Sequence, residues 1–159
     1  MIQAQKNRIE EFLLNSSIKG IHGTLINCCS IPPEYSQVFH LAFGPKSKYI
    51  VVDNTDAAAD AIKLIKENKL GRAVFIVLDM LDPHPALDKV EFAGFIDYFI
   101  NLAKCDEIFK PALYNALENT ILVEELELAK NQFTKFRMVT LDGCILERDG
   151  RITGGYIPN

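Results

Sequence analysis

The sequence predicts a mixed α/β (α+β) fold in two subdomains, on three observations. A strand–helix–strand unit spans residues 49–78, and a strand meander with two tight turns spans residues 136–155. A loop with two prolines, residues 79–89, lies between a half centred on the first unit and a half that ends in the meander. With 159 residues, 48% of them hydrophobic and 24% charged, the chain has the size and composition of one globular domain.

The N-terminal stretch carries residues at coiled-coil spacing. Ile2, Gln5, Ile9 and Phe12 fall at the a and d positions of a heptad, and residues 15–17 interrupt the pattern. Two heptads are fewer than the three or four that define a coiled coil. The stretch is therefore either the end of a longer coiled coil or a simple amphipathic helix.

The next segment predicts a strand and a helix. Residues 20–26 form an apolar strand that glycines interrupt. A helix begins at Pro32-Pro33, where proline suits the first turn, and Gly44-Pro45 ends it. The buried stripe of this helix consists of Tyr35, Val38, Phe39 and Ala42.

A βαβ unit follows. Its strands are residues 49–52 and 73–78, and its helix is capped by residues 53–55 and closed by Gly71. Such strands are parallel and their crossover is right-handed. The continuous apolar character of residues 73–78 predicts a strand buried on both faces. The helix should bury Ala58, Ala61, Ile62 and Ile65.

The second half begins with an apolar, aromatic stretch, residues 90–103, which we interpret as a helix whose aromatic stripe belongs to the core. A helix over residues 108–118 and a strand over residues 120–123 follow. Glutamates at the start of the next helix suit its dipole, and this helix buries Leu126, Ala129 and Phe133. The sequence shows no internal repeat.

The C-terminal meander is predicted by two Asp-Gly turns. Asp142-Gly143 lies between two β-prone runs, and Asp149-Gly150 turns the chain into a last short strand that stops at Gly154-Gly155. Glycine marks a bulge or a place where another backbone comes close. Two interpretations stay open: a loop that needs positive φ, or a sheet edge that receives a partner.

The motifs of nucleotide binding and of nucleophilic catalysis are missing. DNTDAAAD, rather than a glycine-rich turn, follows the strand at residues 49–52, and no GxxxxGK[ST], GxGxxG or Gly-x-Ser-x-Gly occurs. We predict no cofactor and no catalytic residue. A small α/β enzyme whose site is assembled only in space is the enzyme alternative.

The cysteines indicate no metal site. Cys28, Cys29, Cys105 and Cys144 show no CxxC spacing and are expected to be small buried hydrophobes. A zinc site that adds His22 and His40 lacks the ligand spacing of metal modules.

The charge pattern limits the partners. A net charge of −4 argues against a surface that binds nucleic acid throughout, whereas local basic groups can hold phosphates. The candidate DNA-contacting residues are Lys46, Lys48, Lys63, Lys66, Lys69 and Arg72, and a third basic group contains Lys130, Lys135 and Arg137. No apolar run reaches the about 18 residues of a membrane helix, and the polar, acid-containing N-terminus is neither a signal nor a transit peptide.

The chain resembles the hinge domain of the structural maintenance of chromosomes (SMC) proteins. The matching stretches are GIHG (20–23), residues 49–79, residues 116–131, and VTLDGCILERDGRITGG (139–155), in the family's order. The resemblance implies a non-enzymatic hinge between two arms of an antiparallel coiled coil, whose far end carries an ATPase head. Residues 80–104 match only loosely.

The resemblance also implies boundaries. Residues 1–16 would be the end of the incoming arm, residues 17–155 the hinge, and residues 156–159 the start of the returning arm. The two subdomains would cover about residues 17–82 and 90–155.

The resemblance further implies a partner, namely another SMC hinge, either a second copy of this chain or a different SMC chain. The implied interface residues are Gly143, Gly150, Thr153, Gly154 and Gly155, with Gly20 and Gly23 as a second group. Such dimers serve chromosome condensation and segregation, at the nucleoid in the cytoplasm of prokaryotes or in the nucleus of eukaryotes. DNA binding through the lysine groups is the alternative function.

Overall fold

A computed structural model describes residues 7–158. The helices are α1 (Arg8–Leu14), α2 (Ser36–Phe43), α3 (Thr55–Glu67), α4 (Phe99–Leu102), α5 (Lys110–Leu117) and α6 (Leu126–Ala129). The strands are β1 (Ile21–Thr24), β2 (Ile50–Val52), β3 (Phe75–Val77), β4 (Phe95–Tyr98), β5 (Ile121–Val123), β6 (Met138–Thr140), β7 (Ile145–Leu146) and β8 (Ile152–Thr153).

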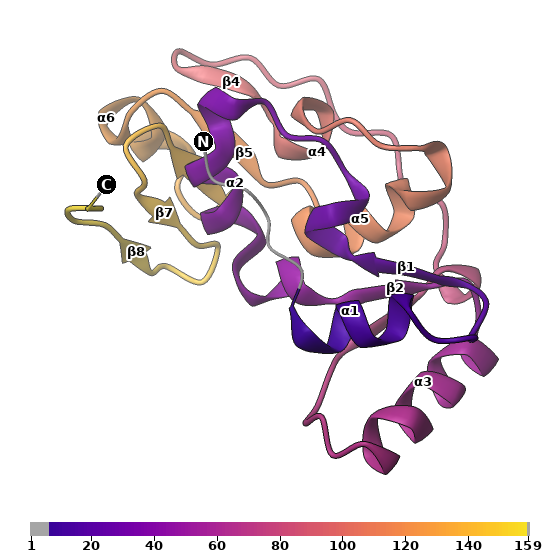
Figure 1. Cartoon of the computed structure of the whole chain (residues 1–159). Helices are drawn as coiled ribbons and strands as arrows, with labels where there is room; N and C mark the ends of the chain where they lie inside the picture. Colours follow the sequence, from indigo (N-terminus) through magenta and orange to yellow (C-terminus); the bar gives the residue numbers. More distant parts are fainter. Residues whose placement is uncertain (1–6, 159) are drawn as a thin grey trace.

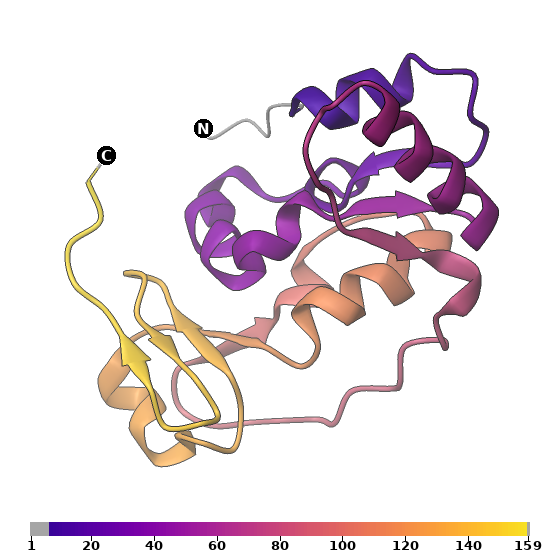
Figure 2. The same ribbon diagram turned by 90° about the horizontal axis from the view of Figure 1, so that it is seen from below.

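The strands form two sheets, which confirms the mixed α+β class. A three-stranded sheet has the order β1-β2-β3 and a five-stranded sheet the order β4-β5-β6-β7-β8 (Figure 1). Each sheet combines one parallel pair, β2 with β3 or β5 with β6, with antiparallel neighbours. The two sheets lie toward opposite ends of the molecule in both views (Figure 2).

The βαβ unit is confirmed, with one correction in its helix. The Asn54 side chain accepts a hydrogen bond of 2.9 Å from the Ala57 amide and so caps α3. The buried residues are Ala57, Ala58, Ala61 and Ile65, whereas Ile62 is 41% exposed. The prediction for Ile62 was wrong because a helix turns by about 100° per residue. Ile62 therefore lies beside, and not on, the face of α3 that packs against the sheet.

Strand β3 is less buried than its apolar run predicts. Only Ile76 is buried, and Phe75 and Val77 are half-buried. Among the described residues β3 pairs with β2 alone, so it is an edge strand. The prediction of a strand buried on both faces was wrong because an apolar run cannot distinguish a central strand from an edge strand that is partly covered.

Other boundaries shift by local effects. Strand β1 has a register shift between Ile21 and Gly23, and residues 25–28 leave it as a short 3-10 turn. The helix expected from Pro33 begins with a 3-10 turn, Pro33–Tyr35, and α2 follows, buries Val38, Phe39 and Ala42, and ends before Gly44. In the second half, the prediction of a helix over residues 90–103 was wrong, because an apolar run alone does not distinguish a buried strand from a helix: β4 takes Phe95–Tyr98 and the short α4 takes Phe99–Leu102. Only a short helix, α6, follows β5.

The meander forms as expected. Strands β6, β7 and β8 pair antiparallel in sequence, and Asp142-Gly143 turns the chain between the first two. Both Gly143 and Gly150 have positive φ, 95° and 98°. The parallel pairing of β6 with β5 joins the meander to β4 and β5 in one sheet.

The two halves of the chain repeat one topology, which the sequence did not reveal. Residues 21–44 and 95–118 correspond without a gap, since β1 matches β4 and α2 matches α5. Three identities remain between them: Ile26 and Ile100, Asn27 and Asn101, and Ala42 and Ala116. The prediction of no repeat was wrong because so few identities remain that the sequence alone does not show the correspondence.

A backbone bridge marks the axis between the halves. Ser30 and Lys104 occupy corresponding positions, and they exchange two hydrogen bonds, from the Ser30 amide at 2.7 Å and from the Lys104 amide at 2.9 Å. Such a reciprocal antiparallel pair is two-fold symmetric. The local axis therefore passes between these residues.

One core serves both halves. Val51 of β2 and Ile76 of β3 join residues of the five-stranded sheet in the larger cluster, and Phe39 of α2 packs edge-on against Phe99 of α4 at 5.0 Å. On the other face of the three-stranded sheet, Ile50 and Val52 pack with α1 and α3 (Figure 2).

Candidate functional site

Strand β8 ends the five-stranded sheet in an open edge. Ile152 and Thr153 pair with β7, and among residues 7–158 no strand covers their outer side. Ile152 is 49% exposed, and Tyr156 just beyond the strand is 86% exposed. An apolar, unpaired strand edge is a template for pairing with another chain.

The glycines of this edge differ in what surrounds them. A Cβ atom at Gly150 or Gly155 would meet nothing within 4 Å, although both residues have positive φ. A Cβ atom at Gly154 would lie 2.9 Å from the Cys144 sulfur, and one at Gly143 would collide with Ile157. Of these four glycines, only Gly150 and Gly155 leave space for a Cβ atom. Gly143 and Gly154 therefore also serve packing inside the meander.

The second predicted group, Gly20 and Gly23, lies beside and within β1. A Cβ atom at Gly20 would lie 3.2 Å from the Asp53 carboxylate, and one at Gly23 would lie 2.7 Å from Glu10 Oε2. Both glycines have positive φ, 87° and 103°. Gly23 is buried against its own chain, and Gly20 is half-buried.

Beside Gly20, His22 Nε2 and Asp53 Oδ1 are 2.6 Å apart, and the His22 ring packs edge-on against Phe109 at 5.1 Å. The Asp53 amide donates to the Gly20 carbonyl at 2.9 Å. The beginning of β1 is thus held to the residue after β2 through Asp53, and to the second half of the chain through Phe109.

The buried Glu10 was missed by the sequence interpretation, which read α1 as a heptad. The Thr24 amide donates to Glu10 Oε2 at 2.6 Å, and Asn27 Nδ2 lies 3.1 Å from both carboxylate oxygens. Leu13 is the other buried residue of α1, whereas Phe12 is exposed, and Ile2 and Gln5 lie outside the described residues. No sequence pattern distinguishes Glu10 from its exposed neighbour Glu11.

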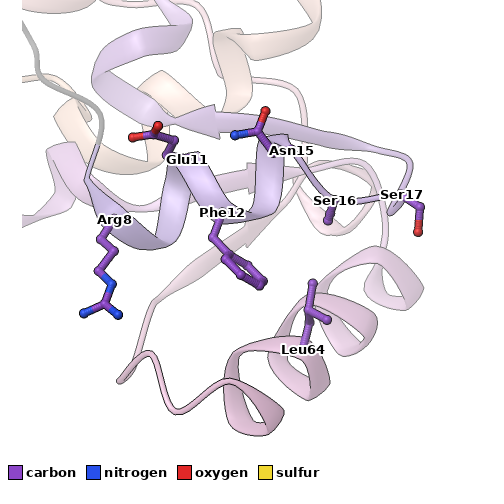
Figure 3. Close-up of a pocket in the computed structure, with 7 residues that line it drawn as sticks. All are labelled: Arg8, Glu11, Phe12, Asn15, Ser16, Ser17 and Leu64. Atoms are coloured by element: carbon purple, nitrogen blue, oxygen red, sulfur yellow. The ribbon is translucent and has the colours of Figure 1, made fainter.

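A groove of about 770 Å³ separates α1 from α3 (Figure 3). Phe12 of α1 and Leu64 of α3 point into it, and Arg8 and Glu11 lie along its α1 side. Ser16 and Ser17 close one end. The groove offers an apolar floor with a polar rim but no group of titratable residues suited to catalysis.

Two of the basic groups meet at a second pocket of about 520 Å³. Lys48 and Arg72 line it together with Arg8. The third basic group is partly neutralised, since Lys130 pairs with Glu127 at 3.3 Å and Arg137 with Glu147 at 2.8 Å. Within residues 7–158 no such ion pair forms at Lys48 or Arg72. Lys63, Lys66 and Lys69 lie exposed on and just after α3, and Lys46 is half-buried.

Cys28, Cys29 and Cys105 lie half-buried at the rim of the shared core. Burial raises the pKa of Cys28 to about 12, with Glu10 and Cys105 as further causes. Burial likewise raises the pKa of Cys29 to about 12, with contributions from Cys105 and Cys28. Across the described part of the chain, no three His, Cys, Asp or Glu side chains are placed to hold a metal ion. The described helices include none that could cross a membrane.

The geometry defines a small α+β domain with two unequal mixed sheets and an open glycine-bounded strand edge, and solved structures share this fold. The hinge domain of the Pyrococcus furiosus SMC protein superposes with a TM-score of 0.81 at 33% identity, covering 96% of this chain and 81% of that one. An asymmetric dimer of the Geobacillus stearothermophilus SMC hinge domain gives 0.82 at 30% identity, covering 95% and 66%.

The sequence comparisons agree. Residues 18–132 match the family described as "SMC proteins Flexible Hinge Domain". The chromosome partition protein Smc of Gloeobacter violaceus is 32% identical over 155 residues. The chain therefore belongs to the SMC hinge family. The alignment covers 98% of this chain but only 13% of the length of the Gloeobacter violaceus protein.

Proposed function

We propose that this chain is the dimerisation hinge of an SMC protein, which joins two chains through open strand edges and has no catalytic role itself. One observation carries the proposal: the outer edge of β8 has no partner strand in the described chain, exposes Ile152, and runs into Gly154-Gly155. Glycine allows another backbone to come close. The dimer named for the Geobacillus stearothermophilus hinge supports the same conclusion.

The interface centres on β8. Thr153 and Gly155 are exposed, and Gly150 lies in the preceding turn. Gly143 and Gly154 leave space inside the meander for Ile157 and Cys144. Main-chain hydrogen bonds along the edge supply affinity, as in β-augmentation. The exposed Ile152 and Tyr156 supply apolar area.

The receiving surface is the three-stranded sheet of the partner. This sheet lies at the end of the molecule opposite β8 (Figures 1 and 2), so one protomer can give and receive at separate places. Gly20 and Gly23 belong to this surface through β1, Gly20 at the strand's entrance and Gly23 by positioning the strand against Glu10. Two such contacts related by a two-fold axis close a ring.

The domain boundaries are part of the proposal. Residues 17–82 contain the three-stranded sheet and residues 90–155 the five-stranded one, which supports a division at the proline loop. Residues 1–16 and 156–159 are then the ends of the two coiled-coil arms. The ATPase head lies elsewhere in the SMC protein, which acts at the chromosome, at the nucleoid or in the nucleus.

Sedimentation equilibrium over a wide concentration range tests the dimer. We expect a stable dimer mass for the chain. Gly155→Trp should give monomers, because a Cβ atom there meets nothing within 4 Å in its own chain, whereas a bulky side chain would keep a partner backbone from coming close.

Gly71→Trp is the matched control. Gly71 also has positive φ, 101°, and equally open surroundings, but it lies in the turn after α3. A dimeric Gly155→Trp would place the interface elsewhere. A wild-type chain that stays monomeric, both alone and when mixed with other SMC hinges, would reject the dimerisation role.

Contact with DNA is a second candidate function, favoured by the meeting of Arg8, Lys48 and Arg72 at one pocket. Lys46, Lys63, Lys66 and Lys69 would extend this basic surface along α3 and the turn before β2. Such a surface would hold phosphates without reading bases.

Fluorescence anisotropy with a labelled duplex tests this function. Affinity should fall steeply as salt rises, and Lys48→Glu with Arg72→Glu should abolish binding. The control, Lys130→Glu with Lys135→Glu, changes the net charge equally in the segment between α6 and β6. An absence of binding at low salt, or an equal loss in both double variants, would rule out a specific basic site.

A further inference from the structure

Three of the four cysteines gather where the two halves of the molecule meet. Cys28 and Cys29 come at the end of the first half's 3-10 turn, and Cys105 follows α4 in the second half. All three are half-buried and pack against the shared core. Neither the proposed interface nor the basic pocket uses them.

The backbone bridge between the halves lies next to two of these cysteines. Ser30 and Lys104 form an antiparallel pair that exchanges both hydrogen bonds. The bridge is isolated, but in regular antiparallel geometry the preceding residue of one segment faces the following residue of the other, which would set Cys29 opposite Cys105 in a non-hydrogen-bonded position.

Burial supports this register. Ser30 and Lys104 are exposed, whereas their neighbours Cys29 and Cys105 point to the less exposed side. The Cys29 backbone is extended, with φ −139° and ψ 162°. Facing residues in non-hydrogen-bonded positions have Cα atoms about 4.5 Å apart in a regular ladder, which falls within the roughly 4.4–6.8 Å that a disulfide spans.

We propose that Cys29 and Cys105 are a site of reversible disulfide formation that joins the two halves of the domain covalently across their internal two-fold axis. The oxidant is a low-molecular-weight disulfide such as oxidised glutathione. The Cys105 thiolate attacks one sulfur of this disulfide, which releases one thiolate and leaves a mixed disulfide on Cys105. The Cys29 thiolate then attacks the Cys105 sulfur and expels the second small thiol, so two protein thiols are oxidised and the small disulfide is reduced.

The surroundings assign the first attack to Cys105. Lys110 lies close enough to favour its thiolate, against the burial that raises the pKa of Cys105. Burial raises the pKa of Cys29, and the nearby Cys105 contributes to the same shift. The same burial makes the reaction slow at neutral pH, since only the thiolate attacks.

Cys28 is the competing partner, and its contacts point elsewhere. Its sulfur lies 3.8 Å from the His22 carbonyl and 4.0 Å from the Gly23 carbonyl, toward β1. The Cys29 sulfur lies 3.8 Å from the Leu25 carbonyl and 3.7 Å from the Ile26 carbonyl. Rotation about its Cα–Cβ bond would give up these weak contacts.

Oxidation of the folded chain with glutathione disulfide, followed by non-reducing peptide mapping, tests the proposal. The expected product is an intrachain cross-link between the peptides holding Cys29 and Cys105, with the loss of two hydrogen atoms. Cys28 and Cys29 share one tryptic peptide, so variants must assign the partner. Cys28→Ser and Cys144→Ser should keep the cross-link, and Cys29→Ser and Cys105→Ser should lose it.

Thermal unfolding supplies an independent readout. The oxidised chain and its Cys28→Ser variant should melt several degrees higher than their reduced forms, and dithiothreitol should reverse the shift. A cross-link that persists in Cys29→Ser, a bond only between two chains, or no cross-link in the wild type at any oxidant concentration would overturn the proposal.

Discussion

The carboxylate of Glu10 occupies the space in which a side chain at Gly23 would stand. Its Oε2 atom would lie 2.7 Å from a Cβ atom at Gly23, and the adjacent Thr24 amide donates to it at 2.6 Å. Helix α1 is thus fastened to β1 by a buried carboxyl group whose described hydrogen-bond donors are the Thr24 amide and the Asn27 side chain.

Removing this carboxylate should destabilise the domain. We expect Glu10→Ala to lower the free energy of unfolding by about 3 kcal/mol, because the buried Thr24 amide loses its acceptor. Glu10→Gln should lose less, since its amide oxygen can still accept. Urea denaturation measures both, and Glu11→Ala on the exposed side of the same helix is the control. Equal effects at positions 10 and 11 would contradict a structural role for Glu10.

A methyl group at Gly23 should disturb the same contact. Gly23→Ala and Gly71→Ala share the cost of a positive φ, about 1–2 kcal/mol, because their φ values are 103° and 101°. Only Gly23 also meets a neighbour, so its variant should be the less stable by a further 1 kcal/mol or so. If the contact is the cause, adding Glu10→Ala should make the extra cost of Gly23→Ala disappear in a double-mutant cycle.

Arg137 ties the meander to α2. Its Nη1 atom donates to the Ala42 carbonyl at 2.8 Å and its Nε atom to Glu147 at 2.8 Å, with both side chains about one-quarter exposed. Arg137→Ala should cost about 2 kcal/mol in the free energy of unfolding. Arg137→Lys should recover only part, because one ammonium group cannot reach both acceptors in the same geometry. The exposed Lys135→Ala is the reference in urea denaturation, and a loss no larger than its own would refute the link.

The Asn54 cap should determine how firmly α3 begins. Asn54→Ala removes the acceptor for the Ala57 amide and should cost about 1 kcal/mol. Asn54→Asp should be neutral or stabilising, because aspartate caps equally well and suits the helix dipole. Chemical denaturation followed by circular dichroism gives the comparison. An unchanged midpoint in the alanine variant would mean that tertiary packing alone holds the helix start.

The half-buried thiols of Cys28 and Cys29 should make the fold sensitive to alkali. The pKa values of Cys28 and Cys29 rise from 9.0 to about 12 in the folded chain. Their contribution to stability is therefore complete below pH 9 and is lost as the pH rises toward 12, because the unfolded thiols ionise first. The denaturation midpoint of the wild type should fall over this range, and that of Cys28→Ser with Cys29→Ser should fall less. Parallel curves would disprove the contribution.

Local signals were sufficient for much of the fold. The Asp142-Gly143 turn and the Asn54 cap act within a few residues, because backbone geometry and a single side-chain acceptor decide them. The βαβ unit also follows from short-range patterns. The glycine-rich end of the meander was noticed for the same reason, whereas its open edge depends on which strands the rest of the chain leaves unpaired.

Whether a residue at the border of the core is buried could not be predicted from such local patterns. Ile62 and the β3 strand look like core in the sequence, yet the sheet covers only part of each. Glu10 looks like a surface residue and is fully buried. Periodicity reports that a residue can be buried, and the packing of distant segments decides whether it is.

By itself the sequence determined the class of fold, most of the helices and strands, and the family resemblance through its glycine turns. Only the tertiary structure decided that the two halves repeat one topology and that Ser30 meets Lys104. The reason is physical: local conformation depends on neighbours along the chain, whereas these relationships depend on residues brought together by a common core.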